Sequence, residues 1–269
     1  MNISRISQYA GGLACAVLIQ SPAMAADPAP TDTSLCAVSG LNAKIEAGGG
    51  YYKDNSNNTK GGRLHVAGSV ALPLSCVFGL QFDGAIGSLD GRTMGGGAIH
   101  AFTRDPSSYL LGGYGEYSIA GNNDVWRFGG EGELYWGQIT FSALAGYENS
   151  DLTNSDVFAA IDLSFYATDN FKISAGYRRF LDIDAAAVGA EWQLDNTPFS
   201  VFTEGQVGSN KYLSVIGGVR FHFGGPQKSL IRRHREDDPF NRLTQLIRRV
   251  APAAAAPGGG GENGGGEIF

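Results

Sequence analysis

The sequence contains little charge and has no long hydrophobic run. Asp, Glu, Lys and Arg make up 17% of its 269 residues, against roughly 25% in an ordinary soluble domain. No stretch reaches the ~18 consecutive apolar residues that indicate a transmembrane helix, so a helical membrane protein is excluded. The net charge of -6 argues against a nucleic-acid partner. Glycine is abundant, with 40 residues and no G-X-Y repeat, which excludes collagen.

The first 25 residues have the features of a secretory signal peptide. Arg5 is followed by an apolar run and then by the A-x-A site at Ala23–Ala25, where cleavage is expected. The mature chain is therefore expected to leave the cytoplasm. A short extended lead-in follows over residues 26–40.

Residues 41–223 repeat one pattern, in which about ten residues alternate between apolar and polar before a turn signal appears. Period-2 alternation predicts β-strands, and each segment has the length that a tilted membrane strand needs. The predicted strands cover residues 42–52, 62–72, 76–87, 93–103, 109–119, 124–135, 138–149, 157–167, 171–180, 186–194, 199–207 and 212–223. The segment 93–103 alternates poorly, so a count of about ten strands is the alternative to about twelve.

The prolines of this region support the same division into strands. Pro73, Pro106 and Pro198 all fall in predicted connections, as expected for a residue that cannot donate to a ladder. They lie on alternate connections and therefore at one edge of an up-and-down sheet. Longer loops are expected at the other edge, over 53–60 and 149–155, as in transmembrane barrels. An even strand number places both ends of the barrel at the periplasmic edge.

Alternation alone fits a soluble β-sandwich as well as a membrane barrel, which exposes its apolar face. The apolar face of this chain carries almost no charge, and aromatic residues gather at strand ends, as in an interfacial girdle. We therefore predict an all-β fold: a single up-and-down antiparallel transmembrane β-barrel. The expected girdle consists of Tyr109, Tyr135, Trp136, Phe171, Trp192, Phe199, Phe221 and Phe223.

The last predicted strand, Tyr212–Phe223, ends in aromatic residues. With the signal peptide and the barrel pattern, it makes the chain similar to Gram-negative outer-membrane β-barrel proteins of the porin-like class. The resemblance covers the signal peptide and residues 41–223. It implies an outer-membrane location, contact with outer-membrane lipid, and recognition of the last strand by the outer-membrane assembly machinery. The chain departs from the family pattern because about 46 residues follow Phe223.

The polar positions of the alternation are expected to line the barrel lumen, since Arg or Lys facing lipid at mid-depth costs about 2–4 kcal/mol. Three histidines, His65, His100 and His222, share this face. The expected lining consists of His65 and the charged residues Lys44, Glu46, Arg63, Asp83, Glu116, Arg127, Glu131, Glu133, Glu148, Asp162, Lys172, Arg178, Glu191, Glu204 and Arg220.

Acids outnumber bases in this lining, which leads to two hypotheses. In a water-filled lumen the acid surplus favours cations, and the protein is then a narrow porin-like diffusion channel with a weak cation preference. In a filled lumen the charges pair, and the protein is a closed structural barrel that supports the envelope or presents its loops and tail to partners. A barrel of about twelve strands lies between the filled and the open sizes.

No motif predicts catalysis or a bound group. The sequence has no nucleophile elbow, zinc-ligand spacing or phosphate loop, so we expect no enzyme activity, no metal and no cofactor. Cys36 precedes the first strand and Cys76 begins the third, so both lie at the periplasmic end. They are expected either to form a disulfide or to remain two free thiols.

Residues 224–269 differ in composition from the barrel and are expected to form a periplasmic tail. Pro239 follows two aspartates, which is typical of a helix start, and apolar residues then recur at helical spacing at Phe240, Leu243, Leu246–Ile247 and Val250. We predict a short basic amphipathic helix, then a Gly/Ala/Pro-rich disordered end. The helix could contact an anionic membrane surface, the barrel mouth or the cell wall; the alternative is a partly ordered solubilising tail.

Overall fold

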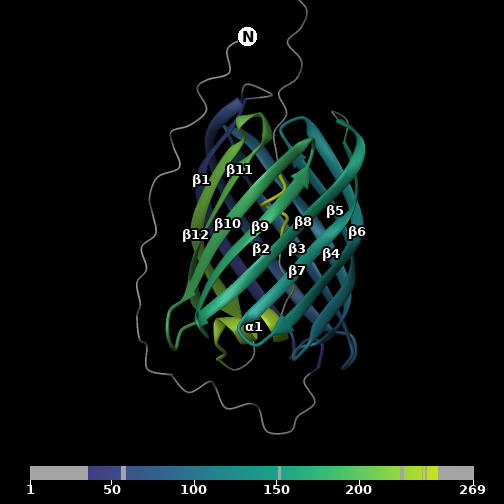
Figure 1. Ribbon diagram of the computed structural model, residues 1–269, viewed down its shortest axis with the longest axis vertical. Helices are drawn as coiled ribbons and strands as arrows, with labels where there is room; N and C mark the ends of the chain where they lie inside the picture. Colours follow the sequence, from purple (N-terminus) through teal and green to yellow (C-terminus); the bar gives the residue numbers. More distant parts are fainter. Residues whose placement is uncertain are drawn as a thin grey trace, which may run out of the picture. The chain divides into compact units, whose positions relative to one another are not determined.

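Antiparallel strands form a closed barrel in the computed structural model of the protein (Figure 1). The structure describes residues 36–55, 59–150, 153–224, 227–237, 239 and 241–247, all within one unit of the chain. The strands are β1 (Asn42–Asp54), β2 (Thr59–Pro73), β3 (Phe78–Leu89), β4 (Arg92–Asp105), β5 (Tyr109–Ala120), β6 (Asn123–Trp136), β7 (Ile139–Ser150), β8 (Thr153–Thr168), β9 (Phe171–Phe180), β10 (Ile183–Gln193), β11 (Phe199–Gly208) and β12 (Leu213–Phe223).

Each strand pairs with its neighbour in sequence, and β1 pairs with β12 to close the barrel. The closing register runs from Ala43 opposite Phe223 to Lys53 opposite Leu213. The predicted up-and-down barrel of twelve strands is confirmed, and the alternative of ten is wrong. The poorly alternating segment 93–103 belongs to β4; its three consecutive glycines (95–97) carry no side chain that could display an apolar and a polar face.

The two ends of the barrel differ, and we call them the base and the rim. The base contains Asn42, Phe223 and the connections with Pro106 and Pro198, whereas Pro73 is the last residue of β2. The rim is formed by the opposite hairpins. The longer loop expected over 149–155 is wrong, because β7 continues to Ser150 and β8 begins at Thr153, so these polar residues extend the ladder.

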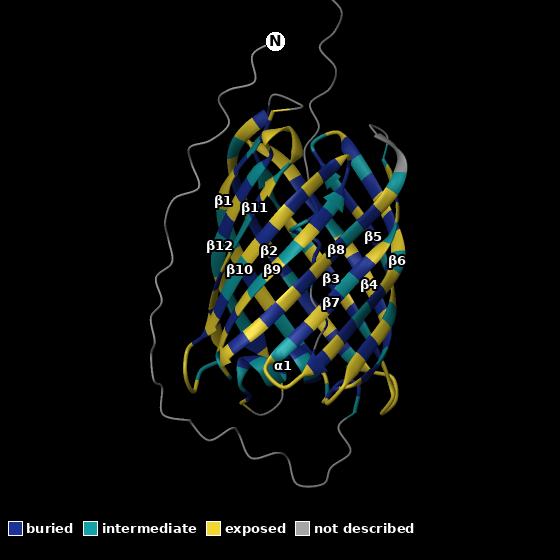
Figure 2. Cartoon of the chain, in the orientation of Figure 1, coloured by how far each residue is buried: buried dark blue, intermediate teal, exposed yellow. Residues whose placement is uncertain are grey.

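The two faces of the wall are inverted relative to a soluble protein. Exposed and buried residues alternate along the strands (Figure 2), and large apolar side chains such as Leu64, Phe128 and Val188 point outward. A polar interior with an apolar exterior is the arrangement of a transmembrane barrel.

The aromatic girdle is exposed at most of the expected positions, and Trp136, at 81%, is the most exposed large apolar residue in the described part of the chain. Phe221 is half-buried. The assignment of Tyr135 is wrong: this side chain is buried and its hydroxyl donates to Glu133 at 2.9 Å. Residues two apart on a strand share a face, so Tyr135 points inward with Glu133.

Two short helical elements accompany the strands. The 3₁₀-helix η1 (Ser209–Lys211) lies in the turn between β11 and β12, and α1 (Leu230–Glu236) lies at the base (Figure 1). Among the described residues no helix is long and apolar enough to cross a membrane. The signal peptide, most of the lead-in and the Gly/Ala/Pro-rich end are outside the described residues.

Candidate functional site: a lumen filled by the C-terminal segment

The predicted lumen residues all lie on the inner side of the wall. Lys44, Glu204 and Arg220 line an internal cavity, and the other members of the set are buried. His100 and His222 are buried as well. The alternation therefore identified which charges face inward, but not what they contact there.

Many of these charges pair with one another between strands of the wall. Arg127 donates to Glu116 at 2.7 Å and to Glu148 at 2.9 Å. Arg220 donates to Glu46 at 2.7 Å and to Glu191 at 2.6 Å. Charge-assisted hydrogen bonds of this kind compensate the desolvation of buried ions.

His100 lies between two carboxylates. Its Nε2 is 3.0 Å from Asp83 and its Nδ1 is 2.8 Å from Glu131. The ring also meets Tyr114 edge-on. With both nitrogens engaged and the ring fully buried, His100 joins β3, β4 and β6 rather than facing an open passage.

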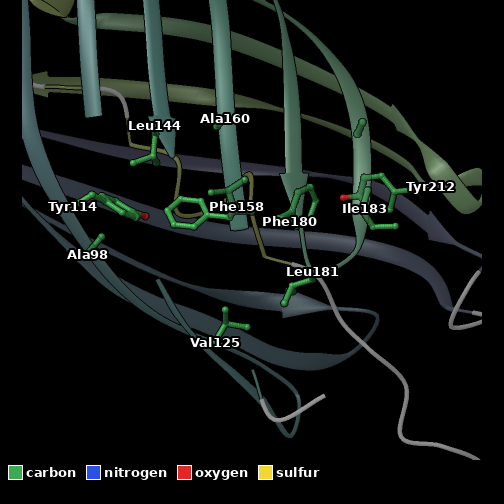
Figure 3. Packing of buried hydrophobic residues seen from close by; sticks show 12 residues of the cluster. Ala98, Tyr114, Val125, Leu144, Phe158, Ala160, Phe180, Leu181, Ile183 and Tyr212 are labelled. Carbon is green, nitrogen blue, oxygen red and sulfur yellow. The ribbon is translucent and has the colours of Figure 1, made fainter. Parts of the chain in front are cut away.

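The rim half of the interior also holds an apolar cluster. Phe158, Phe180, Ile183 and Tyr212 are buried there and converge on one another (Figure 3). Leu246 from the C-terminal segment belongs to the same cluster. The lumen is therefore occupied by apolar side chains as well as by charges.

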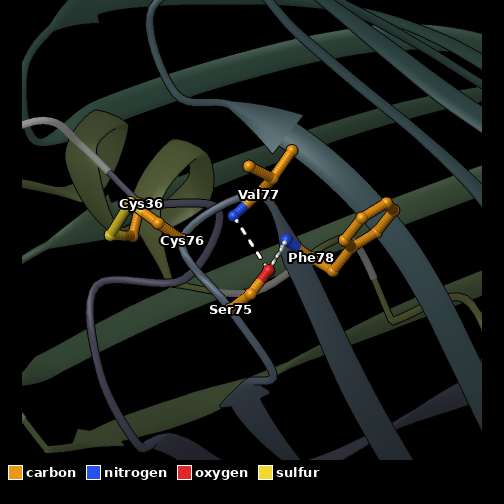
Figure 4. The surroundings of a disulfide bond; sticks show 5 residues. All are labelled: Cys36, Ser75, Cys76, Val77 and Phe78. Carbon is orange, nitrogen blue, oxygen red and sulfur yellow. Dashed lines mark hydrogen bonds between the residues drawn. A yellow bond between two sulfur atoms is a disulfide. The ribbon is translucent and has the colours of Figure 1, made fainter.

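At the base, the lead-in is joined to the barrel by a disulfide. Cys36 and Cys76 are bonded, with their Cα atoms 4.2 Å apart, and the amide of Ala37 donates to Cys76. The Ser75 hydroxyl accepts hydrogen bonds from the amides of Val77 and Phe78 in the same turn (Figure 4). Of the two states that the sequence left open, the structure has the bridged one.

The C-terminal segment is held at the base by a cluster that we call the base clasp: Ser39, Lys228, Glu236 and Asp237. The Ser39 hydroxyl donates to Asp237 at 2.8 Å and its amide donates to the Glu236 carbonyl at 2.9 Å. Lys228 forms ion pairs with both acids. Burial alone would raise the pKa of Glu236, but hydrogen bonds from Arg232 and Lys228 outweigh it and lower that pKa.

Beyond the clasp, the segment enters the lumen. The Gln81 side chain donates to the Pro239 carbonyl at 3.3 Å, and Asn241 donates to Ser69 at 3.2 Å. Arg242 donates to Ser142 at 2.9 Å and forms an ion pair with Asp162.

The next residues contact wall positions closer to the rim. Arg63 donates to the Thr244 carbonyl, Arg178 donates to the Gln245 side chain, and Arg127 donates to the Leu246 carbonyl. Ile247 packs among Tyr52, Leu89, Met94 and Ala120, which lie at the ends of strands at the rim. The described residues of 227–247 therefore extend through the barrel from the base to the rim; we call this stretch the inserted segment.

The predicted helix is wrong in position. The helix α1 ends before Pro239, and residues 241–247 are not helical, with a turn over 243–245. The physical reason is that wall side chains, rather than helical amides, donate to the carbonyls of Thr244, Gln245 and Leu246. Phe240 and Arg248–Val250 lie outside the described residues, and the described part of the tail contacts the barrel interior.

Little space is left in the interior. A cavity of about 50 Å³ lies between the segment and the wall, beside Lys172, Glu204 and Arg242. One water needs about 10–15 Å³ of such volume, so the cavity has room for a few waters.

The segment matches the wall electrostatically. The sequence of 227–247 contains five Lys and Arg residues and three Asp and Glu residues, whereas the predicted lumen lining has more acids than bases. The ion pair between Arg242 and Asp162 and the contact of His234 with Glu191, at 3.5 Å, show this match directly. The inserted segment thus compensates the acid surplus of the wall.

Several residues of this site were missed by sequence reasoning. Arg104 donates to the Ala37 carbonyl at 2.7 Å and to the Asp237 carbonyl at 3.3 Å, and its inward position follows from the alternation of β4. Lys228, Asp237 and Arg242 belong to the tail, where the only signal was a basic composition next to an acidic lumen.

Comparisons with known proteins identify the fold. No family model matches the chain, and no curated protein matches it. The KdgM porin in complex with disordered oligogalacturonate is 10% identical, covers 67% of this chain and 99% of its own, and superposes with a TM-score of 0.50. The COG4313 outer membrane channel from Pseudomonas putida F1 is 11% identical, covers 73% and 100%, and has a TM-score of 0.48.

Outer membrane phospholipase A from Escherichia coli is also similar, at 11% identity over 70% of this chain and 97% of its own, with a TM-score of 0.46. The solved structures that resemble this chain therefore include porins, channels and an enzyme. The resemblance expected from the sequence is confirmed as a fold: the chain is a closed twelve-strand antiparallel β-barrel, and the KdgM porin has a similar fold.

Proposed function

We propose that this protein is a channel-type barrel of the Gram-negative outer membrane whose lumen is closed by its own C-terminal segment. The observation that carries the proposal is the path of residues 227–247 through the interior, from the base clasp to Ile247 at the rim. The porin-like fold and the apolar exterior support the membrane location. The base would face the periplasm and the last strand would be read by the assembly machinery.

Withdrawal of the segment would open a narrow, acidic path. Asp162 would lose Arg242, and Glu191 would lose His234, which leaves carboxylates facing the passage. Acidic linings favour cations, so the open state is expected to prefer them weakly. Arg63, Arg127 and Arg178, which now donate to the segment, would keep this preference modest.

A closed structural barrel is the second candidate, and one observation favours it. Arg127 with Glu116 and Glu148, and His100 with Asp83 and Glu131, are pairings of the wall alone. They would persist without the segment and could keep the lumen closed.

We assign no catalytic activity. Within the described residues, a serine and a histidine approach each other at Ser200 and His222, with the Ser200 oxygen 3.5 Å from the ring. Ser200 is fully buried and donates to Glu191 at 2.8 Å, so its proton is engaged by a carboxylate. A nucleophile needs a base within hydrogen-bonding reach and access to substrate.

The test is single-channel conductance in a planar bilayer under a KCl gradient. The full chain is expected to be silent or to open rarely. A variant lacking residues 225–269 is expected to conduct with a cation-selective reversal potential, and Glu204→Gln in that background is expected to reduce the selectivity. Heat-modifiable gel migration verifies that each protein is folded.

A full-length variant provides the matched comparison. Arg242→Glu places like charges together at Asp162 and is expected to increase the open probability. Arg179→Gln, which changes an exposed ion pair at the rim, serves as its control and should remain as silent as the native chain. Folded protein that stays silent after both the truncation and Arg242→Glu would favour the closed structural barrel.

A further inference from the structure

Two lysines face each other on the outer surface of the rim. Lys53 of β1 is the register partner of Lys60 of β2. Both follow the outward alternation of their strands, in line with the exposed Tyr51 and Leu64. Cβ atoms of such directly opposed residues lie about 5 Å apart, and like charges at this spacing destabilise a sheet.

Neither charge is compensated by a residue that the structure describes. Within the described residues the two ammonium groups have no ion pair and no hydrogen bond. Lys211, exposed in η1 next to β1, adds a third positive charge at this edge. An anion from outside the chain would relieve the repulsion.

On the opposite side of the rim, an outward-facing cation is paired with carboxylates of the chain. Arg179 of β9 is an outward cation at a comparable height, but it lies 2.8 Å from Asp156 and 3.2 Å from Asp184. The fold neutralises Arg179 and leaves Lys53 and Lys60 uncompensated.

An apolar groove lies below the two lysines on the outer faces of β1, β2 and β3. Its volume is about 510 Å³, and Ala47, Leu64, Val66 and Ile86 contribute to its lining. Leu64 and Ile86 are 68% and 66% exposed. Gly62 separates Lys60 from Leu64, and a Cβ atom at this glycine would meet nothing within 4 Å, so on β2 no side chain lies between Lys60 and the groove.

We propose that this surface binds a phosphorylated lipid, with the phosphate between Lys53 and Lys60 and one acyl chain along Leu64, Val66 and Ile86. Leu64 lies four positions after Lys60, which is about 13 Å along a strand, so the charged end and the apolar end are in line. Unpaired cations near a membrane surface attract anionic headgroups. The inference rests on the membrane location proposed above and not on the channel activity.

The test uses the refolded full chain in neutral detergent and native mass spectrometry. Lipid A, which carries phosphates and acyl chains, is titrated against phosphatidylethanolamine, which has no net charge. The native protein is expected to retain lipid A preferentially. The double variant Lys53→Gln/Lys60→Gln is expected to bind lipid A roughly thirtyfold more weakly, whereas Arg179→Gln should bind as the native chain does.

A groove variant separates a lipid site from a phosphate site. Ala47→Trp fills the groove without a change of charge and is expected to weaken lipid A binding. Three results would each overturn the proposal. The double lysine variant could bind lipid A as well as the native chain does, or the native chain could retain both lipids equally. Inorganic phosphate could also compete fully with lipid A while Ala47→Trp has no effect. Because conductance is not measured here, failure of the channel proposal would leave this result unaffected.

Discussion

The barrel wall and the inserted segment are built by different kinds of contact. Each wall strand pairs with the next strand along the chain, and only the seam between β1 and β12 joins distant residues. The wall partners of the segment are distant in sequence: Thr244 is 181 residues from Arg63, and Pro239 is 158 residues from Gln81. The wall is complete as a hydrogen-bonded sheet without the segment, whereas the lumen is not filled without it.

The two regions also satisfy their polar groups differently. In the wall, backbone amides pair with backbone carbonyls, and the inward side chains pair with one another. In the segment, carbonyls of residues 244–246 accept hydrogen bonds from Arg63, Gln206 and Arg127. A segment held by side chains can leave the lumen without breaking the sheet, so the wall and the segment should respond separately to mutation.

The largest effect is expected from a buried ion of the wall. Arg127→Met would leave Glu116 and Glu148 without their cation, which should lower the free energy of unfolding by about 3–5 kcal/mol. Urea unfolding in lipid vesicles, followed by tryptophan fluorescence, measures the loss. Arg179→Met removes an exposed pair with 38% of the arginine side chain accessible and should cost no more than about 1 kcal/mol. Equal losses would contradict the contrast between buried and exposed pairs.

A cavity in the segment should loosen the segment and leave the wall intact. Leu246 is fully buried, and Leu246→Ala is expected to weaken its attachment by about 2–5 kcal/mol. Hydrogen exchange over 241–247 should accelerate, while the strands keep their protection. Leu134→Ala, on the exposed outer face, is the control. Faster exchange in the strands as well would show that wall and segment unfold together.

Loss of the disulfide should destabilise the base of the barrel more than the rim. Replacement of Cys36 and Cys76 by serine is expected to lower the free energy of unfolding by about 2–4 kcal/mol. The disulfide joins the lead-in to the turn before β3, and Ser39 of the lead-in in turn contacts the base clasp. Limited proteolysis should show earlier cleavage near residues 36–41. Unchanged proteolysis at the base would mean that the hydrogen bonds of Ser39 suffice.

The smallest effect is expected from pH, through the base clasp. The pKa of Glu236 is lower in the folded protein than its ordinary value of 4.5, so its contribution is fully present above pH 4.5 and is lost as the pH falls through the lowered pKa. Release of the segment, followed by hydrogen exchange, should therefore increase below pH 4.5. Glu236→Gln should flatten this dependence; a steep dependence that persists in the variant would contradict its assignment to Glu236.

The sequence by itself determined the wall. Alternation with period 2 identified all twelve strands and the inward position of charges such as Glu131 and Arg178, because in a membrane barrel each residue faces either lipid or lumen. It misplaced Tyr135, since an aromatic residue at a strand end fits either face. It also indicated that Cys36 and Cys76 lie at one end, but it left their bond open.

Only the tertiary structure decided what occupies the lumen. Leu246 and Ile247 follow the apolar spacing of a helix, yet their partners are wall residues on several strands, and no local pattern encodes a contact between residues so far apart in the sequence. The acid surplus of the wall could be counted from the sequence, as could the basic surplus of the tail. Which charges pair is determined by the closed barrel with the segment inside it, because the desolvation of buried charges is compensated by partners in space and not by neighbours in sequence.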